Sequence, residues 1–170
     1  MKKLFGIILF ASLITLSSFV FGQATLKLGY IDSNELLQLM PEKDSVEARL
    51  MDYQRSLESQ IEAMLMEYQT KVQQYRNTAA TMSDIIKQTK EKEITDLETR
   101  IQQFQQTAEL DFQNKQQELY NPLFEKARKA INDVAAENGF TYIFDVSTGS
   151  LLYFDKGTNI LPLVRKKMGI

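Results

Sequence analysis

The residue types that most often carry out catalysis are missing from this sequence. Its 170 residues include no histidine and no cysteine, which removes imidazole acid–base catalysis, thiol nucleophiles and the usual zinc ligands. Asp145 and Asp155 could form a carboxylate pair, but aspartates beside turn residues are most often local hydrogen-bond acceptors. The seven glycines form neither a phosphate-binding loop nor a dinucleotide fingerprint. We therefore expect no enzyme activity, no cofactor and no metal site.

Methionine is the residue type whose placement suggests binding. Five of the six methionines after position 22 lie between residues 40 and 82, and methionine adapts to apolar partners of different shapes. Met64 falls in the apolar stripe of a predicted helix, where packing alone explains it, whereas Met51 and Met66 fall beside that stripe. With neighbouring apolar side chains near the stripe and the tip, the candidate binding residues are Met51, Met64, Met66, Tyr68, Tyr75 and Met82.

Residues 1–22 are typical of a secretory signal peptide. Lys2 and Lys3 precede a predominantly apolar run from Leu4 to Leu16, and small and polar residues follow. A membrane anchor is the alternative, but the run is short for a span, which needs roughly 20 apolar residues. We expect export and cleavage after Gly22, with cleavage after Ala24 as a second choice.

The charge balance argues against a nucleic-acid partner. Without Lys2 and Lys3 the chain has 18 basic and 22 acidic residues, and residues 41–119 alone have 10 basic and 15 acidic. Nucleic-acid binders need a basic surface. Contact with a membrane surface stays open but receives no support from this charge. We interpret the charged and glutamine-rich positions as a solvated helix face without chemistry.

Residues 41–119 predict a long antiparallel helical hairpin. Pro41 opens the first helix or bends the chain before it, and neither glycine nor proline interrupts the sequence up to about Asn77. The apolar pattern fails at about residues 77–84, where we place the tip, and returns from Ile94. Two amphipathic helices of matched length bury their stripes most simply against each other. The stripe of the first helix is Leu50, Tyr53, Leu57, Ile61, Met64, Tyr68, Val72 and Tyr75.

The remaining residues, 23–40 and 120–170, predict a small α+β body. Three runs rich in β-forming residues lie at about 26–31, 140–146 and 151–154, and the last two have the pattern of a β-hairpin. So few residues make a core of marginal size. We therefore expect the body to associate with other copies of itself.

Several helix ends carry recognisable signals. Asp32 or Ser33 is expected to cap a helix that runs to Met40, and the Ser and Thr residues before Asp84 can cap the returning helix. Asn138–Gly139 provides a glycine stop for that returning helix. Asn159 is expected to cap a short terminal helix.

Two blocks of sequence stand out on either side of the predicted arm. The first comprises Leu28–Ser33 and Leu36–Glu42, and the second comprises Lys115–Leu119, Pro122 and Ala135–Phe140 with the following strands. Together they resemble the Skp (OmpH-like) family of periplasmic chaperones. The blocks stand in the family's order around arms of the family's length. The resemblance covers the whole chain after the signal peptide.

The resemblance implies a homotrimer in which strands of three subunits form a small β-barrel-like body and three helical hairpins project around a cavity. It also implies a periplasmic, ATP-independent holdase that binds unfolded outer-membrane proteins and prevents their aggregation. The acidic arm departs from the strongly basic members of the family, so no lipopolysaccharide site is carried over. A structural coiled-coil spacer or adaptor of the cell envelope is the alternative.

Overall fold

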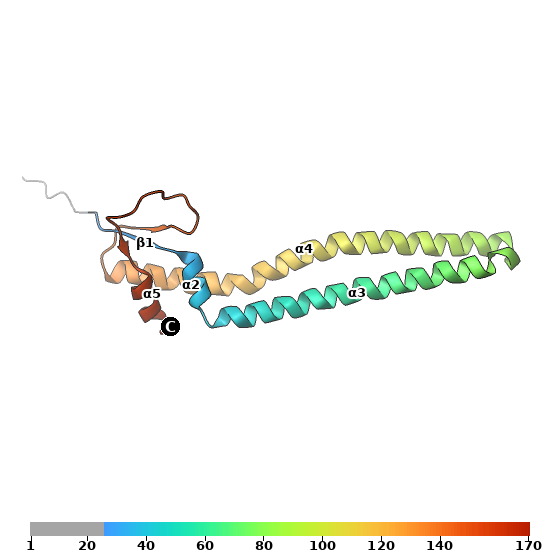
Figure 1. Ribbon diagram of the computed structural model, residues 1–170, viewed down its shortest axis with the longest axis horizontal. Helices are drawn as coiled ribbons and strands as arrows, with labels where there is room; N and C mark the ends of the chain where they lie inside the picture. Colours follow the sequence, from blue (N-terminus) through green and yellow to red (C-terminus); the bar gives the residue numbers. More distant parts are fainter. Residues whose placement is uncertain (1–25) are drawn as a thin grey trace, which may run out of the picture.

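A computed structural model describes residues 26–170 (Figure 1), and the predicted signal peptide lies outside the described residues. Two long helices project from a small group of strands and short helices at one end. We call residues 41–119 the arm, and residues 26–40 with 120–170 the body. The elements in chain order are β1 (Leu28–Ile31), α2 (Ser33–Leu39), α3 (Glu42–Thr78), the 3-10 helix η2 (Ala79–Thr81), α4 (Asp84–Glu137), β2 (Tyr142–Asp145), β3 (Thr158–Asn159) and α5 (Leu161–Met168).

The sheet has three strands in the order β2-β1-β3, and both pairings are parallel. Leu28–Ile31 of β1 lies beside Tyr142–Asp145 of β2, and Gly29 and Tyr30 lie beside the two residues of β3. A parallel pair needs a crossover connection. Between β1 and β2 that connection includes the entire arm, so the arm is an insertion between neighbouring strands of the body.

The predicted strand at 151–154 and the β-hairpin that would contain it are wrong. The third strand is Thr158–Asn159, and residues 146–157 form a connection that carries the chain to the other edge of β1. Both edges of β1 are occupied by parallel partners, and the chain after β2 runs to the β1 edge opposite β2 instead of turning back along β2 as a hairpin requires. It lies against the sheet through a side chain instead, with the rings of Tyr30 and Phe154 4.6 Å apart.

The long helices α3 and α4 lie side by side with opposite chain directions (Figure 1). Glu42 at the start of α3 pairs with Lys126 far along α4, whereas Lys71 near the end of α3 approaches Glu93 near the start of α4. The chain reverses through η2, within the segment predicted as the tip. Ser83 then caps α4 by accepting a hydrogen bond from the Ile86 amide.

The other helix ends follow their sequence signals closely. Asp32 caps α2 by accepting from the Glu35 amide. The N-cap of α5 is Ile160 and not the predicted Asn159, which lies one residue earlier and accepts from the Leu161 amide. Gly139, just beyond α4, has φ +66°, a conformation that favours glycine. Pro122 lies inside α4 without ending it. Among the described residues, no helix is both long and apolar enough to cross a membrane.

The hydrophobic core lies where the base of the arm meets the body. Thirteen buried side chains form one cluster between β1, α2, the start of α3, the later part of α4 and α5. Leu36, Ile160 and Val164 are completely buried there. The cluster consists of Ile31, Leu36, Met40, Val46, Leu50, Leu119, Leu123, Ala127, Ala130, Val134, Ile160, Leu161 and Val164.

Candidate functional site

The arm buries far less than the body. Beyond the core cluster, the buried apolar residues of the described chain are only Leu97, Ile101 and Ala108, all on α4. The predicted stripe of α3 does face α4, but after Leu50 its members are only half buried. A two-helix pair has no third element to cover the sides of its contact. The arm therefore leaves apolar surface accessible along its length.

Several large apolar side chains of the arm are more than a third exposed. Ile85 and Ile86, in the first turn of α4 at the tip, are 78% and 49% exposed. Scattered exposed apolar residues are common on protein surfaces, but adjoining ones such as Leu65 and Met66, or Ile85 and Ile86, offer a contact surface for another molecule. The exposed set in the arm is Met51, Leu65, Met66, Ile85, Ile86 and Leu110.

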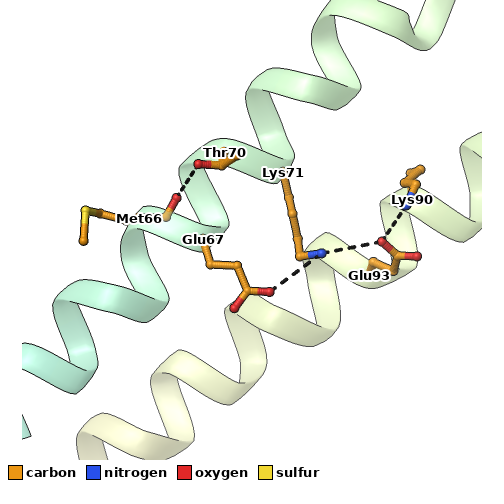
Figure 2. A network of polar contacts seen from close by, with 6 residues as sticks. All are labelled: Met66, Glu67, Thr70, Lys71, Lys90 and Glu93. Atoms are coloured by element: carbon orange, nitrogen blue, oxygen red, sulfur yellow. Dashed lines mark hydrogen bonds and ion pairs between the residues drawn. The ribbon is translucent and has the colours of Figure 1, made fainter.

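The six predicted binding residues occupy three different environments. Met64 and Tyr68 are half buried at the contact between the helices. Met51 and Met66 are 55% and 56% exposed, and Figure 2 shows Met66 on the side of α3 away from α4. Tyr75 and Met82 lie together in a hollow below the tip. The structure thus brings two of the six into one concave site.

This distal hollow, the concavity between the end of α3, the tip and the start of α4, has a volume of about 280 Å³. Its apolar part comes from Tyr75, Met82 and Ile94, which are each half buried. Its polar part comes from two lysines, a glutamate, a glutamine and a threonine. The lining residues are Lys71, Gln74, Tyr75, Thr78, Met82, Lys90, Glu93 and Ile94.

A network of charged side chains crosses one wall of the distal hollow (Figure 2). Lys90 Nζ lies 2.9 Å from Glu93 Oε2 on the same helix. Lys71 extends from α3 towards α4, where its Nζ is 3.8 Å from the same Glu93 oxygen and 3.7 Å from Glu67 Oε1. Both Lys71 distances exceed a normal hydrogen bond. The Lys71 ammonium is therefore held between two carboxylates without a close bond to either.

Hydrogen bonds shift the pKa values of Glu93 and Tyr75 beside the distal hollow. The hydrogen bond from Lys90 lowers the pKa of Glu93, and the positive charge of Lys71 adds to this effect. The Tyr75 hydroxyl donates a hydrogen bond to Glu91, which raises the pKa of Tyr75. At neutral pH Glu93 is therefore a carboxylate and Tyr75 a neutral phenol.

The arm's positive charge is concentrated around this hollow. Residues 71–93 contain five basic and three acidic residues, whereas the rest of the arm contains five basic and twelve acidic. The prediction that all charged positions form a solvated helix face did not identify this excess of basic residues near the tip. A usable signal was present, because Lys71 lies three residues after Tyr68 and four before Tyr75, which is the spacing of the stripe itself.

The body has an apolar surface of its own. Leu152 and Tyr153 in the connection after β2 are 95% and 74% exposed, and Tyr142 of β2 is 56% exposed. A shallow hollow of about 200 Å³ lies beside them. Its apolar lining consists of Leu28, Tyr30, Phe144, Leu151, Tyr153 and Phe154.

The two aspartates considered as a carboxylate pair act as local acceptors. Asp145 accepts from the Ser33 amide and hydroxyl at 3.2 and 2.5 Å and from the Ser147 amide at 3.0 Å. Asp155 accepts from the Tyr153 hydroxyl at 3.3 Å. Within residues 26–170 no group of three or more aspartate or glutamate side chains is arranged to hold a metal ion. Asp145 instead ties the end of β2 to the start of α2.

Comparison with known proteins identifies sequences of similar length. The sequence profile of the outer membrane protein (OmpH-like) family matches residues 27–168. The chain is 26% identical to the chaperone protein Skp of Photorhabdus laumondii over 168 residues, which cover 99% of both chains. It is 25% identical to the chaperone protein Skp of Photorhabdus luminescens over 147 residues, covering 86% of this chain and 88% of the relative.

A solved structure has a similar fold. The crystal structure of an OmpH-like protein from Caulobacter crescentus CB15 superposes with a TM-score of 0.71 over 88% of both chains. The two sequences are only 11% identical, so this similarity concerns the fold. The arrangement of a long helical arm on a small body is thus found in a second protein of very different sequence.

Proposed function

Because this chain belongs to the outer membrane protein (OmpH-like) family, we propose that it is an ATP-independent holdase chaperone that binds unfolded outer-membrane proteins and prevents their aggregation. The observation that carries this proposal is the set of exposed large apolar side chains on the arm, from Met51 to Leu110. Many weak apolar contacts suit clients of unrelated sequence. The chaperone names of the Photorhabdus relatives support the same role.

We further propose that the protein acts as a homotrimer in the periplasm. Residues 23–40 and 120–170 would form the shared body and residues 41–119 the arms around a client cavity. The exposed apolar surface of Tyr142, Leu152 and Tyr153 supports association of bodies, because monomers seldom expose such patches without a partner. Residues 1–22 would direct export and be removed.

Aggregation of a client tests the proposal. The mature chain from Gln23 is mixed with an outer-membrane β-barrel protein that is then diluted out of urea, and light scattering is followed. We expect the client to stay soluble at about one trimer per client, without added nucleotide. Static light scattering of the mature chain without client measures its mass in solution, which is expected to be that of three subunits.

The two outcomes separate the holdase from a spacer. A trimer that leaves client aggregation unchanged would favour the spacer or adaptor of the cell envelope. A test variant in which Met51, Met66 and Ile85 are changed to serine removes exposed apolar side chains and keeps the buried contacts of the arm. It is expected to protect the client less well while staying trimeric.

A further inference from the structure

We propose that the distal hollow is a pocket for one aromatic side chain of the bound unfolded chain. This inference rests on the proposed holdase function and specifies what part of the client the end of the arm recognises. The occupant is a tryptophan, tyrosine or phenylalanine side chain, inserted between α3 and α4 below the tip. The rest of the client would lie outside the hollow.

The size of the hollow suits a single ring. Its volume is about 280 Å³, whereas a dry protein cavity of about 150 Å³ is sufficient to bind benzene. An indole fits with room to spare, but a folded segment does not. The hollow also opens to solvent, so an exposed side chain of an extended chain can enter it directly.

The lining chemistry favours an aromatic ring over an aliphatic side chain. Met82 supplies a thioether for sulfur–aromatic contact, and Tyr75 supplies a ring for edge or offset stacking. Lys71 and Lys90 supply ammonium groups, which are attracted to the face of an aromatic ring. Lys71 is suited to this because neither of its carboxylate neighbours is closer than 3.7 Å. It can turn towards a ring without breaking a short hydrogen bond.

An anion is a poor occupant of the same hollow. Glu93 lies within it, and its lowered pKa means that it is charged at neutral pH. Glu67 lies beside Lys71 and adds a second negative charge. A carboxylate or phosphate would have to displace Glu93 from Lys90. A neutral ring needs no such displacement.

A second hollow between the helices provides an internal comparison. It lies halfway along the arm, has a volume of about 320 Å³, and is lined by Leu57, Ile61, Ala108 and Phe112 with glutamine and glutamate side chains. It contains no lysine or arginine. The Phe112 ring provides stacking here, but without an ammonium group or a methionine in its lining we expect this hollow to prefer aromatic over aliphatic side chains less strongly than the distal hollow does.

The proposed clients have the matching chemistry. Transmembrane β-strands alternate apolar and polar residues and carry girdles of aromatic residues at both membrane interfaces. An unfolded barrel protein therefore presents isolated aromatic side chains at intervals along a largely neutral chain. Each arm of the protein could hold one of them.

The test uses the absence of tryptophan from the chain. A short peptide of alternating threonine and valine with one central tryptophan is titrated with the mature protein, and the peptide's own fluorescence is followed. A matched peptide carries cyclohexylalanine in place of tryptophan and competes for the site. We expect a blue shift on binding, and competition about two- to fivefold weaker from the ring without π electrons.

Variants assign the binding to this hollow. Gln74→Phe places a ring in the hollow and is expected to remove the part of the blue shift that comes from the distal hollow. Gln73→Phe adds the same ring on the neighbouring position outside the lining and is expected to retain the full shift. Lys71→Met and Lys90→Met are expected to remove the preference for tryptophan over cyclohexylalanine. Lys92→Met, which removes a nearby charge outside the lining, is the matched control.

The outcomes distinguish this inference from the proposed function. Suppose the unmodified protein protects a barrel protein from aggregation, but the Gln74→Phe variant binds the tryptophan peptide as well as the unmodified protein does. The proposed pocket is then wrong, and the holdase function stands. Equal binding of the two peptides also overturns the pocket. If the unmodified protein neither protects the client nor binds the peptide, the holdase itself fails.

Discussion

The body and the arm of this protein differ in how completely they bury their apolar side chains. Among residues 26–170, thirteen of the sixteen buried apolar side chains form one cluster in the body and at the base of the arm, and only Leu97, Ile101 and Ala108 are buried elsewhere. The hydrophobic effect scales with the apolar area removed from water. The body therefore stabilises the subunit, while the arm keeps apolar surface available for a partner.

Truncation of a core leucine should show the largest difference between the two regions. Leu36→Ala in the completely buried site of α2 is expected to lower the free energy of unfolding by about 3 kcal/mol. Leu57→Ala in the half-buried contact of α3 removes the same atoms but should cost about 1 kcal/mol, because solvent already reaches the site. Urea unfolding followed by circular dichroism measures both. Equal losses of unfolding free energy in the two variants would contradict the proposed difference between the body and the arm.

Leu97 tests whether the arm can be weakened without affecting the body. It is 1% exposed and is the most deeply buried side chain of the arm outside the core cluster. Leu97→Ala is expected to destabilise the distal half of the arm by about 2 kcal/mol. Amide hydrogen exchange should then accelerate in the facing segment of α3 and stay unchanged in β1 and α5. Acceleration in the sheet would mean that arm and body unfold as one unit.

A smaller effect is expected from acid at the carboxylate that ties β2 to α2. Burial raises the pKa of Asp145, but hydrogen bonds from Ser33 and Ser147 outweigh it, so the pKa lies below the ordinary value of 3.8. Because the pKa is lowered, the stabilisation that these hydrogen bonds give the folded protein is present above pH 3.8. It is lost as the pH falls through the pKa of Asp145 in the folded protein. Asp145→Asn should therefore lose stability at neutral pH and show a shallower acid transition in thermal unfolding. An unchanged acid transition would rule out this role.

The smallest effect is expected at the distal end of the arm, from alkali. The hydrogen bond to Glu91 raises the pKa of Tyr75 above its ordinary value of 10.0. The contact is thus fully present below pH 10 and is lost as the pH rises through the folded-state value. Tyr75→Phe should speed amide exchange at the start of α4 at neutral pH and remove its alkaline dependence. Tyr53→Phe, which loses the equivalent bond to Asp111 near the base, is the matched comparison.

The parts of the fold that were predictable depend on local chemistry. Ser83 and Gly139 mark helix ends through a side-chain acceptor and a left-handed conformation, and both act within a few residues of their own position. The strand predicted at 151–154 was wrong, because strand pairing depends on how the chain after β2 crosses the sheet. It crosses to the other edge of β1, where Thr158 and Asn159 pair, and no local signal in two residues could reveal this.

The candidate site was predictable only in part for a related reason. The apolar stripe identified Tyr75 as facing the other helix, but the residue opposite it depends on where the chain reverses. Lys90 and Ile94 join Tyr75 in the distal hollow through the geometry of the tip. The exposure of Met66 followed from its position beside the stripe. Whether these residues contact a client remains a prediction.

Hydrogen exchange in the presence of a client tests the central claim most directly. The mature protein is mixed with an outer-membrane β-barrel protein diluted from urea, and amide exchange is compared with that of the protein alone. We predict slower exchange along α3 and the first half of α4, with β1, β2 and α5 unchanged. Protection confined to the sheet, or no protection while the client stays soluble, would contradict the assignment of client binding to the arm.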